Sequence, residues 1–354
     1  MSDAPDPRVM RLADYAAAGV SEPSQPIEIL SLEQLRQRSQ ATTWVVKHFI
    51  PADSLGLIFG ASGAFKSFLA LDLAMHVAHG IDWLGRKTRQ GAVLIIAAEG
   101  GAGIWKRICA WHRERRIRWQ DAPVHVITVP VDLLQDASAV RAAADAIGIA
   151  PQLVLVDTLS QTFSGEENSA NEVASYLREL GLQLRACWQC AVVVVHHTGH
   201  MATERPRGSS ALRANVDFMF GAFRDENEMM ATMECAKQKD GEQPAPESFV
   251  LKVVELGRDD DGDAITSLVA TQVSAAAALE AMKHESERGR GGRNSLFLSL
   301  ALNGVEEKKL RTTFCEAVDG DANAKRQAYF RAKRWAMNAG VLEIARGVVI
   351  RLMD

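Results

Sequence analysis

The sequence predicts an α/β fold built on a doubly wound, mostly parallel sheet. Three short apolar runs lack the alternation of a half-exposed strand, which is typical of parallel strands buried on both faces. These runs are residues 91–98, 153–157 and 191–195. Segments with helical periodicity separate them, and this order implies right-handed parallel crossovers. Because ligands in such sheets bind at the C-terminal strand ends, the residues after these runs are the candidates for chemistry.

The composition restricts the class of protein. The chain has 354 residues, 47% of them hydrophobic and 24% charged, which suits one core domain and an additional module. No apolar run approaches the ~20 residues that span a bilayer, and the N-terminus lacks the basic and apolar regions of a signal peptide. Five irregularly spaced cysteines do not make a disulfide framework. We therefore expect a cytoplasmic protein with no membrane partner.

Residues 1–42 are expected to form an N-terminal arm, because four prolines interrupt any long helix there. A short helix is predicted near residues 31–38. The arm either packs on a neighbouring subunit or is disordered. The core domain is predicted over residues 43–275, and its first strand at 44–50.

A phosphate-binding loop follows in the core domain. Residues 55–59 are apolar, Gly-Ala-Ser-Gly-Ala-Phe-Lys-Ser runs from Gly60 to Ser67, and residues 68–78 have helical periodicity. Backbone amides of such a loop cradle phosphate oxygens at the helix N-terminus. Lys66 can reach the terminal phosphates, and the Ser67 hydroxyl can ligate magnesium.

One position departs from the usual phosphate-loop pattern, because Phe65 stands where glycine is expected. A glycine-rich turn that merely enters a core helix is the alternative interpretation. The predicted nucleotide-binding set is the loop with the first helical turn: Gly60, Ser62, Gly63, Ala64, Phe65, Lys66, Ser67 and Phe68.

Polar side chains end the later buried strands. Asp157 follows an apolar run as the magnesium-holding acid of phosphate-loop NTPases does. Glu99 ends another run and can act as a general base toward an attacking water; a solvated loop glutamate is the alternative. His196 and His197 end the strand after Asp157, and one of them can sense the terminal phosphate, although a structural pair or a metal site is also open.

Cys187 and Cys190 lie at the other end of that strand, too far from the histidines to share a zinc with them, and are expected to pack in the core.

The remaining elements of the core domain follow from periodicity and turn residues. A polar loop is expected over residues 160–170, and a longer one over 198–213 that enters a helix. Three antiparallel strands are expected near residues 229–235, 249–255 and 265–270. Helices are predicted at 103–115, 137–147 and 171–185, and a further strand at 124–129.

A Gly/Arg-rich linker over residues 276–293 precedes a last module at 294–354. The module is expected to have three helices, near 295–301, 308–317 and 325–339, and then two short strands. Helices followed by a small hairpin indicate a winged helix-turn-helix. Residues 283–354 carry 14 basic and 9 acidic side chains, whereas the whole chain has a net charge of -4. A basic tail on an acidic body is a weak indication of nucleic acid, and ordinary scatter of charge explains it as well.

Taken together, the motifs resemble those of RecA-like ATPases of the plasmid and phage RepA helicase type. The quoted residues are the phosphate loop, Ala-Ala-Glu-Gly at 97–100, Leu-Val-Leu-Val-Asp-Thr at 153–158, Val-His-His-Thr-Gly at 195–199 and Arg-Gly-Ser-Ser-Ala-Leu-Arg at 207–213. The resemblance covers roughly residues 43–270 and implies a RecA-like P-loop NTPase core that uses ATP and Mg²⁺. It also implies a hexameric ring that moves along single-stranded DNA.

The resemblance assigns roles to matching positions. Lys66 and Ser67 would bind phosphate and magnesium, Glu99 would be the catalytic base, Asp157 the magnesium acid and His197 the phosphate sensor. Arg107, on the helix after Glu99, matches an arginine expected near the nucleotide. The family also supplies a basic finger from the adjacent subunit, and four residues compete for that role here: Arg207, Arg213, Lys237 and Lys239.

The sequence thus predicts an ATP hydrolase that works on DNA, a replicative helicase of a plasmid, phage or integrated element. A primase or a replication initiator is an expected partner. Two alternatives remain at this point: a DNA-dependent ATPase that loads or remodels proteins on DNA, and a nucleotide-gated DNA-binding regulator without unwinding activity.

Overall fold

The computed structural model describes most of the chain in two compact units, residues Met1–Thr43 and Trp44–Asp354. The described residues are 29–38, 43–98, 101–199, 202–206, 210–224, 229–273, 293–338, 341–345 and 347–352. In the first unit the described element is α2, Leu32–Arg38, which confirms the predicted short helix. Ser31 caps it, because its hydroxyl accepts from the backbone amide of Gln34 at 3.3 Å.

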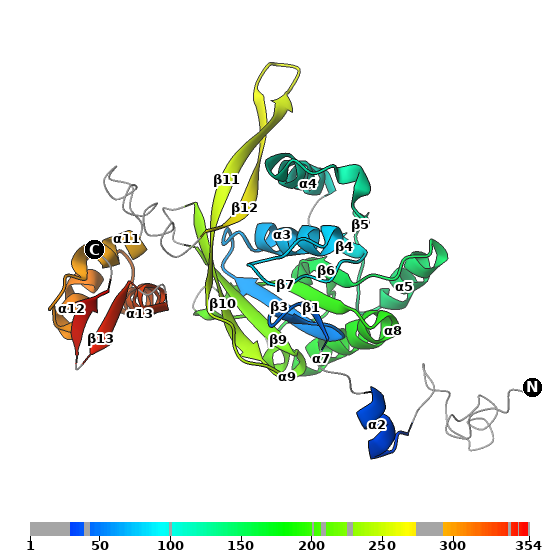
Figure 1. Cartoon of the computed structure of the whole chain (residues 1–354), viewed down its shortest axis with the longest axis horizontal. Helices are drawn as coiled ribbons and strands as arrows, with labels where there is room; N and C mark the ends of the chain where they lie inside the picture. Colours follow the sequence, from blue (N-terminus) through cyan, green and yellow to red (C-terminus); the bar gives the residue numbers. More distant parts are fainter. Residues whose placement is uncertain are drawn as a thin grey trace, which may run out of the picture. The chain divides into compact units, whose positions relative to one another are not determined.

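A ten-stranded sheet organises the second unit (Figure 1). Its order is β12-β11-β10-β9-β3-β7-β6-β4-β5, and β8 pairs with β7 outside this path. The strands are β3 Ser54–Gly60, β4 Val93–Ala97, β5 Val124–Ile127, β6 Leu153–Asp157, β7 Ala191–Gly199, β8 Ala202–Pro206, β9 Phe218–Arg224, β10 Met230–Gln238, β11 Glu247–Arg258 and β12 Ala264–Val273.

The half of the sheet from β9 to β5 is parallel, as the sequence predicts. Successive side chains of one strand enter different cores: Val193 of β7 packs in the core that includes α3, and Val194 in the core that includes α7. Helices therefore cover both faces, which is why these strands are apolar throughout. The helices of this half are α3 Lys66–His79, α4 Gly101–Arg115, α5 Ala137–Ala146, α6 Leu159–Thr162, α7 Ala170–Glu179 and α8 Ala186–Trp188, with 3-10 turn η1 Trp119–Asp121.

The other half, β9 to β12, is antiparallel and confirms the three late strands. A long β11–β12 hairpin runs beside α4 (Figure 1). Lys252 of β11 pairs with Glu114 of α4 at 3.0 Å, and Arg115 donates to the carbonyl of Ala270 at 3.2 Å. The hairpin turn uses Gly262 with a positive φ of 86°, a conformation that glycine adopts without steric strain.

Three expectations about local structure were wrong. Residues 44–50 are not one strand: β1, Trp44–Val46, turns back and pairs antiparallel with β2, Ile50–Pro51. The long polar loop after His197 is instead largely a hairpin, because β7 continues to Gly199 and β8 pairs with it before α9, Ala211–Asn215. The polar loop expected over residues 160–170 begins instead with the short helix α6, Leu159–Thr162, whereas the helix expected at 171–185 is confirmed as α7 continued by a π-helical turn, Leu180–Arg185.

A buried carboxylate joins α3 to α4. Asp72 of α3 is 2% exposed and accepts three hydrogen bonds. The donors are the indole nitrogens of Trp83, at 2.8 Å, and Trp111, at 2.7 Å, and a guanidinium nitrogen of Arg115, at 2.6 Å. A buried charge is tolerated when it is paired and hydrogen-bonded, as here, so α3 and α4 are locked to each other.

The C-terminal residues form α11 Arg293–Leu300, α12 Glu307–Ala317, α13 Ala322–Asn338 and a hairpin of β13 Leu342–Ala345 with β14 Val348–Arg351. Glu306, just before α12, makes an isolated antiparallel bridge to Val348. Phe297, Phe314 and Tyr329 are among the side chains of a separate core that these elements share. The helices and strands thus fall where the sequence predicts them; the division into a linker and a winged module stays a prediction.

Of the two cysteines expected to pack in the core, Cys190 lies there, whereas Cys187 is only half-buried. Cys190 is fully buried, and burial raises the pKa of its thiol to about 12. In the part of the chain that the structure describes, no group of three His, Cys, Asp or Glu side chains could hold a metal ion. Nor does any described helix have the length and apolarity to cross a membrane.

Candidate active site

The phosphate loop lies where β3 leaves the sheet. Gly60, the last residue of β3, sits against β9 so closely that a Cβ would lie 2.3 Å from the carbonyl oxygen of Ala222, so only glycine fits. The amide of Ala64 donates to the carbonyl of Ala61 at 3.1 Å and closes the turn, and α3 begins at Lys66. Gly60, Ser62, Gly63, Ala64, Phe65, Lys66, Ser67 and Phe68 therefore all lie in this loop and the first turn of α3.

The side chain of Lys66 is held inside the site. The residue is 5% exposed, and its Nζ donates to the Ala61 carbonyl at 2.8 Å and lies 3.3 Å from Nδ1 of His197. The parallel register explains the second contact, because Gly60 of β3 is the partner of His197 of β7. The structure thus brings the predicted phosphate-binding lysine and the predicted sensor histidine together.

The two candidate magnesium ligands also meet. Ser67 Oγ donates to Oδ1 of Asp157 at 3.1 Å, although Asp157 ends β6 and β7 lies between β6 and β3. Asp157 is 8% exposed. A hydroxyl and a carboxylate are the oxygen donors that magnesium prefers, so these residues fit a magnesium ion that arrives with a nucleotide.

The backbone of Phe65 adopts a conformation that favours glycine. Its φ is 59° and its ψ 15°, in the left-handed region, where a residue with a Cβ is strained by roughly 1–2 kcal/mol. The ring of Phe65 lies under the guanidinium of Arg224, with Cζ 4.2 Å from the ring centroid, and edge-on to Phe68 at 6.2 Å. Both contacts are made by the residue whose backbone conformation is disfavoured for a side chain with a Cβ.

Arg224 was missed in the sequence, because it ends an apolar strand 159 residues after Phe65 and belongs to no motif. One signal was present: a phenylalanine at a glycine position needs support from elsewhere in the fold. Besides the ring of Phe65, Nη1 of Arg224 contacts the loop tip, donating to the carbonyl of Gly63 at 3.3 Å.

Arg107 of α4 is the arginine that the resemblance expects near the nucleotide. Its Cζ lies 4.8 Å over the ring of Phe68, in the first turn of α3. It thus stands beside the loop by contact with an aromatic side chain. Its predicted role toward a nucleotide stays a prediction.

Two further site residues lie outside the described residues, Glu99 and Arg207. The strand before Glu99 ends at Ala97, whose partner in the neighbouring strand is Asp157. The chain therefore leaves β4 beside the candidate magnesium ligand, and α4 begins at Gly101. The proposed roles of Glu99 and Arg207 stay predictions.

The lysines of β10 lie elsewhere. Lys237 is the partner of Met219, which in turn is the partner of Leu57, three residues before Gly60 on β3. This places Lys237 about 10 Å from the loop along the strand direction, toward the N-terminal ends of the parallel strands. The structure does not bring Lys237 or Lys239 to Lys66 within one subunit.

Both lysines are also engaged within the chain. Lys237 Nζ donates to the carbonyls of Val216, at 2.5 Å, and Arg213, at 2.7 Å, at the C-terminal end of α9. Burial lowers the pKa of Lys237. Lys239 pairs with Asp217 at 3.4 Å, an acidic partner that lies 22 residues away in sequence.

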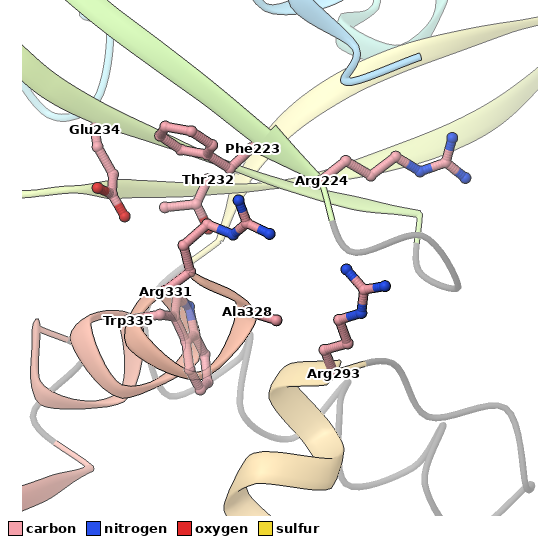
Figure 2. A pocket seen from close by; sticks show the side chains of 8 residues that line it. All are labelled: Phe223, Arg224, Thr232, Glu234, Arg293, Ala328, Arg331 and Trp335. Atoms are coloured by element: carbon pink, nitrogen blue, oxygen red, sulfur yellow. The ribbon is translucent and has the colours of Figure 1, made fainter. Parts of the chain in front are cut away.

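Arg224 also lines a hollow (Figure 2). Its walls come from β9, β10, α11 and α13, and Glu234 of β10 pairs with Arg334 of α13 at 3.3 Å. The side chains that line it are Phe223, Arg224, Thr232, Glu234, Arg293, Ala328, Arg331 and Trp335. Arg224 is thus shared by this hollow and the phosphate loop.

The matches to known proteins include one family model and, among solved structures, a helicase and a recombinase. No curated protein matches the sequence. A structure of a DnaB-like replicative helicase and its interactions with primase is 14% identical over 62% of this chain, with a TM-score of 0.48. The match spans 64% of that helicase chain, less than two thirds of its length. The RadB recombinase is 14% identical over 57% of this chain and 88% of its own, with a TM-score of 0.42.

The family is found by sequence. The AAA domain profile matches residues 21–203, more than half of the chain, and this range contains the phosphate loop, Asp157 and His197. P-loop ATPases of this kind bind ATP, usually with Mg²⁺, and the loop, the lysine and the oxygen donors described above suit that ligand. On this match and this geometry, the chain belongs to the AAA domain family and has the phosphate loop and the mostly parallel α/β core of a P-loop ATPase.

Proposed function

We propose that the protein is an ATP-dependent motor on single-stranded DNA, a replicative helicase of the plasmid, phage or integrated-element RepA type. The observation that carries the ATPase part is the convergence of Lys66, His197 and the Ser67–Asp157 pair at the end of three parallel strands. The DNA part rests on the resemblance of the motif set to RepA-type helicases.

In this proposal, the loop amides and Lys66 bind and orient the phosphates of ATP. Ser67 and Asp157 would hold magnesium, which supplies positive charge that neutralises the phosphate oxygens. Glu99 accepts a proton from the attacking water as the general base. His197 reports the state of the terminal phosphate to β7 and the β7–β8 hairpin, because it belongs to that strand.

The assembly is proposed as a hexameric ring with ATP between subunits. Arg207, Arg213, Lys237 and Lys239 remain the candidates for a basic finger that acts on the neighbouring subunit. The distance of Lys237 from Lys66 within one subunit supports action in trans. Mixing Lys66→Ala subunits with Lys237→Ala subunits should then restore part of the activity, since one mixed interface keeps both groups. A protein that stays monomeric with ATP and DNA contradicts the ring.

DNA is proposed to bind along the β7–β8 hairpin through its phosphates. The strand β8 carries Arg205, and His197 lies in β7, the other strand of the hairpin. Phosphate contacts imply little sequence preference and a strong salt dependence. A primase or a replication initiator is the proposed protein partner.

The test of the function is ATP turnover with and without single-stranded DNA, followed by strand displacement on a forked duplex. We expect DNA to stimulate turnover and the fork to be unwound. Glu99→Gln should bind ATP but turn it over roughly 10²–10⁴-fold more slowly. ATP turnover without unwinding of the fork would favour the alternative function, a DNA-dependent ATPase that loads or remodels proteins on DNA. No turnover under any condition contradicts the proposal.

A second candidate is a nucleotide-gated DNA-binding regulator. Three basic side chains, Arg311, Lys325 and Arg326, line one hollow between α12 and α13, which favours a nucleic-acid contact in this region. If the winged-helix prediction is right, α13 would be the recognition helix. Sequence-specific duplex binding by the full chain, lost in Lys325→Ala/Arg326→Ala, would support this candidate; sequence-independent binding would contradict it.

A further inference from the structure

We propose that Arg224 is a positioning residue that holds the phosphate loop in its nucleotide-binding shape. It compensates for the presence of Phe65 at a position where a phosphate loop usually has glycine. This inference rests on the proposed ATP site and adds a residue that no motif contains. The ligand of the loop is the phosphate chain of ATP, and Arg224 affects its binding by positioning the loop.

The loop requires support at position 65. Phe65 has a φ of 59°, and a bulky residue persists in this region only where its surroundings determine the conformation. Phe65 is also the residue immediately before Lys66, so its backbone sets the direction in which the helix and the phosphate-binding lysine start. A loop that relaxed at Phe65 would misplace the amides that face the phosphates.

Arg224 contacts the loop at two points. Its guanidinium covers the Phe65 ring at 4.2 Å, and its Nη1 donates to the Gly63 carbonyl at 3.3 Å. The first is a cation–π contact with the strained residue, and the second fixes the loop tip two residues earlier. One side chain thus clamps both ends of the turn Gly63–Phe65.

The clamp is anchored in the sheet rather than in the loop. Arg224 ends β9, which is parallel to β3, and the carbonyl of Ala222 in β9 meets Gly60 where the loop begins. Phe68, the other aromatic contact of Phe65, belongs to α3 and moves with the helix that the loop must orient. Arg224 therefore supplies the connection from the loop to a fixed element.

The test is a double-mutant cycle on binding of Mg-ATP to the full chain, with a fluorescent ATP analogue as the probe. Arg224→Ala should weaken binding ~10-fold in the natural background. In the Phe65→Gly background the same change should alter binding less than ~2-fold, because glycine adopts a positive φ unaided. Arg224→Lys, which keeps a charge over the ring, should recover part of the loss.

Arg258→Ala is the matched control, since Arg258 also donates to a glycine carbonyl, that of Gly262 at 2.7 Å, in an exposed turn of β11–β12. It should leave binding unchanged. Thermal unfolding without nucleotide separates a general loss of stability from a loss of loop geometry. Arg224→Ala should lower the affinity for Mg-ATP by more than its change in melting temperature accounts for. If Arg224→Ala lowers the affinity for Mg-ATP equally in both backgrounds, or does not lower it when Phe65 is present, the inference is overturned. The proposed ATP site is unaffected by either result. If the natural chain binds no Mg-ATP, the proposed function and the inference both fall.

Discussion

Nζ of Lys66 lies 3.3 Å from Nδ1 of His197, although 131 residues separate them in the chain. An ammonium group can only donate, so in a hydrogen bond between them Nδ1 is the accepting nitrogen of the imidazole. The contact ties the phosphate-binding lysine to β7, the strand that continues into the β7–β8 hairpin. A change at the phosphate therefore has a direct physical route to the proposed DNA contact.

Replacing His197 should uncouple DNA from hydrolysis. In His197→Ala, Lys66 keeps its bond to the Ala61 carbonyl, so ATP affinity should change less than about threefold, or under ~1 kcal/mol. Stimulation of turnover by single-stranded DNA should be lost. The measurement is ATP turnover over a DNA titration, with His125→Ala, on β5, as the control. Full DNA stimulation in His197→Ala would contradict the sensor role.

Replacing Asp157 should raise the requirement for magnesium. Asparagine keeps an oxygen that can accept from Ser67 but loses the negative charge that attracts the cation. The Mg²⁺ concentration for half-maximal turnover of Asp157→Asn should rise roughly tenfold or more, equal to ~1.4 kcal/mol. Asp263→Asn, in the exposed β11–β12 turn, should behave like the natural chain. An unchanged magnesium dependence would remove Asp157 from the metal site.

Replacing Asp72 should destabilise the fold, because three buried or half-buried donors lose their acceptor. Breaking a buried charge pair costs about 3–5 kcal/mol, so Asp72→Ala should lower the free energy of unfolding by that order. The control is Asp145→Ala: Asp145 also accepts from an indole, that of Trp188 at 2.9 Å, but is exposed. It should cost less than ~1 kcal/mol. Denaturant unfolding of the two variants provides the measurement, and equal losses would contradict the buried network.

Acidification should destabilise the fold from about pH 6.5 downward. Burial lowers the pKa of His76, His79 and His112, which surround Trp111, below the ordinary value of 6.5. Between the folded and unfolded pKa values the unfolded chain binds more protons, so stability falls as pH falls through this window. Melting temperatures between pH 7 and 5 test this, since most carboxylates stay charged there.

His76→Gln should reduce this pH dependence, because glutamine does not titrate. His76 is buried, and its ring nitrogen Nδ1 donates to the Asp72 carbonyl at 2.7 Å, a bond that a glutamine amide can replace. His48→Gln, at an exposed turn residue, serves as the control. A melting temperature of the natural chain that is constant from pH 7 to 5 would contradict the prediction.

The sequence by itself determined the α/β core, because strands buried on both faces must be apolar throughout and the phosphate loop must join a strand to a helix. It also placed Gly60, Asp157 and His197 at strand ends, since their order along the chain follows the parallel crossovers. The sequence did not predict the hairpin of β7 and β8, because polar strands that pair outside the core have no alternation of apolar and polar residues.

Only the tertiary structure decided which side chains meet across strands. Arg224 reaches Phe65 because β9 pairs directly with β3, and Lys237 points to the end of α9 because β10 is antiparallel to β9. The pairing of β3 with β9 joins segments that are far apart in the chain, and no local pattern of residues encodes it. The partner of a strained loop residue is therefore visible only once the sheet has been assembled.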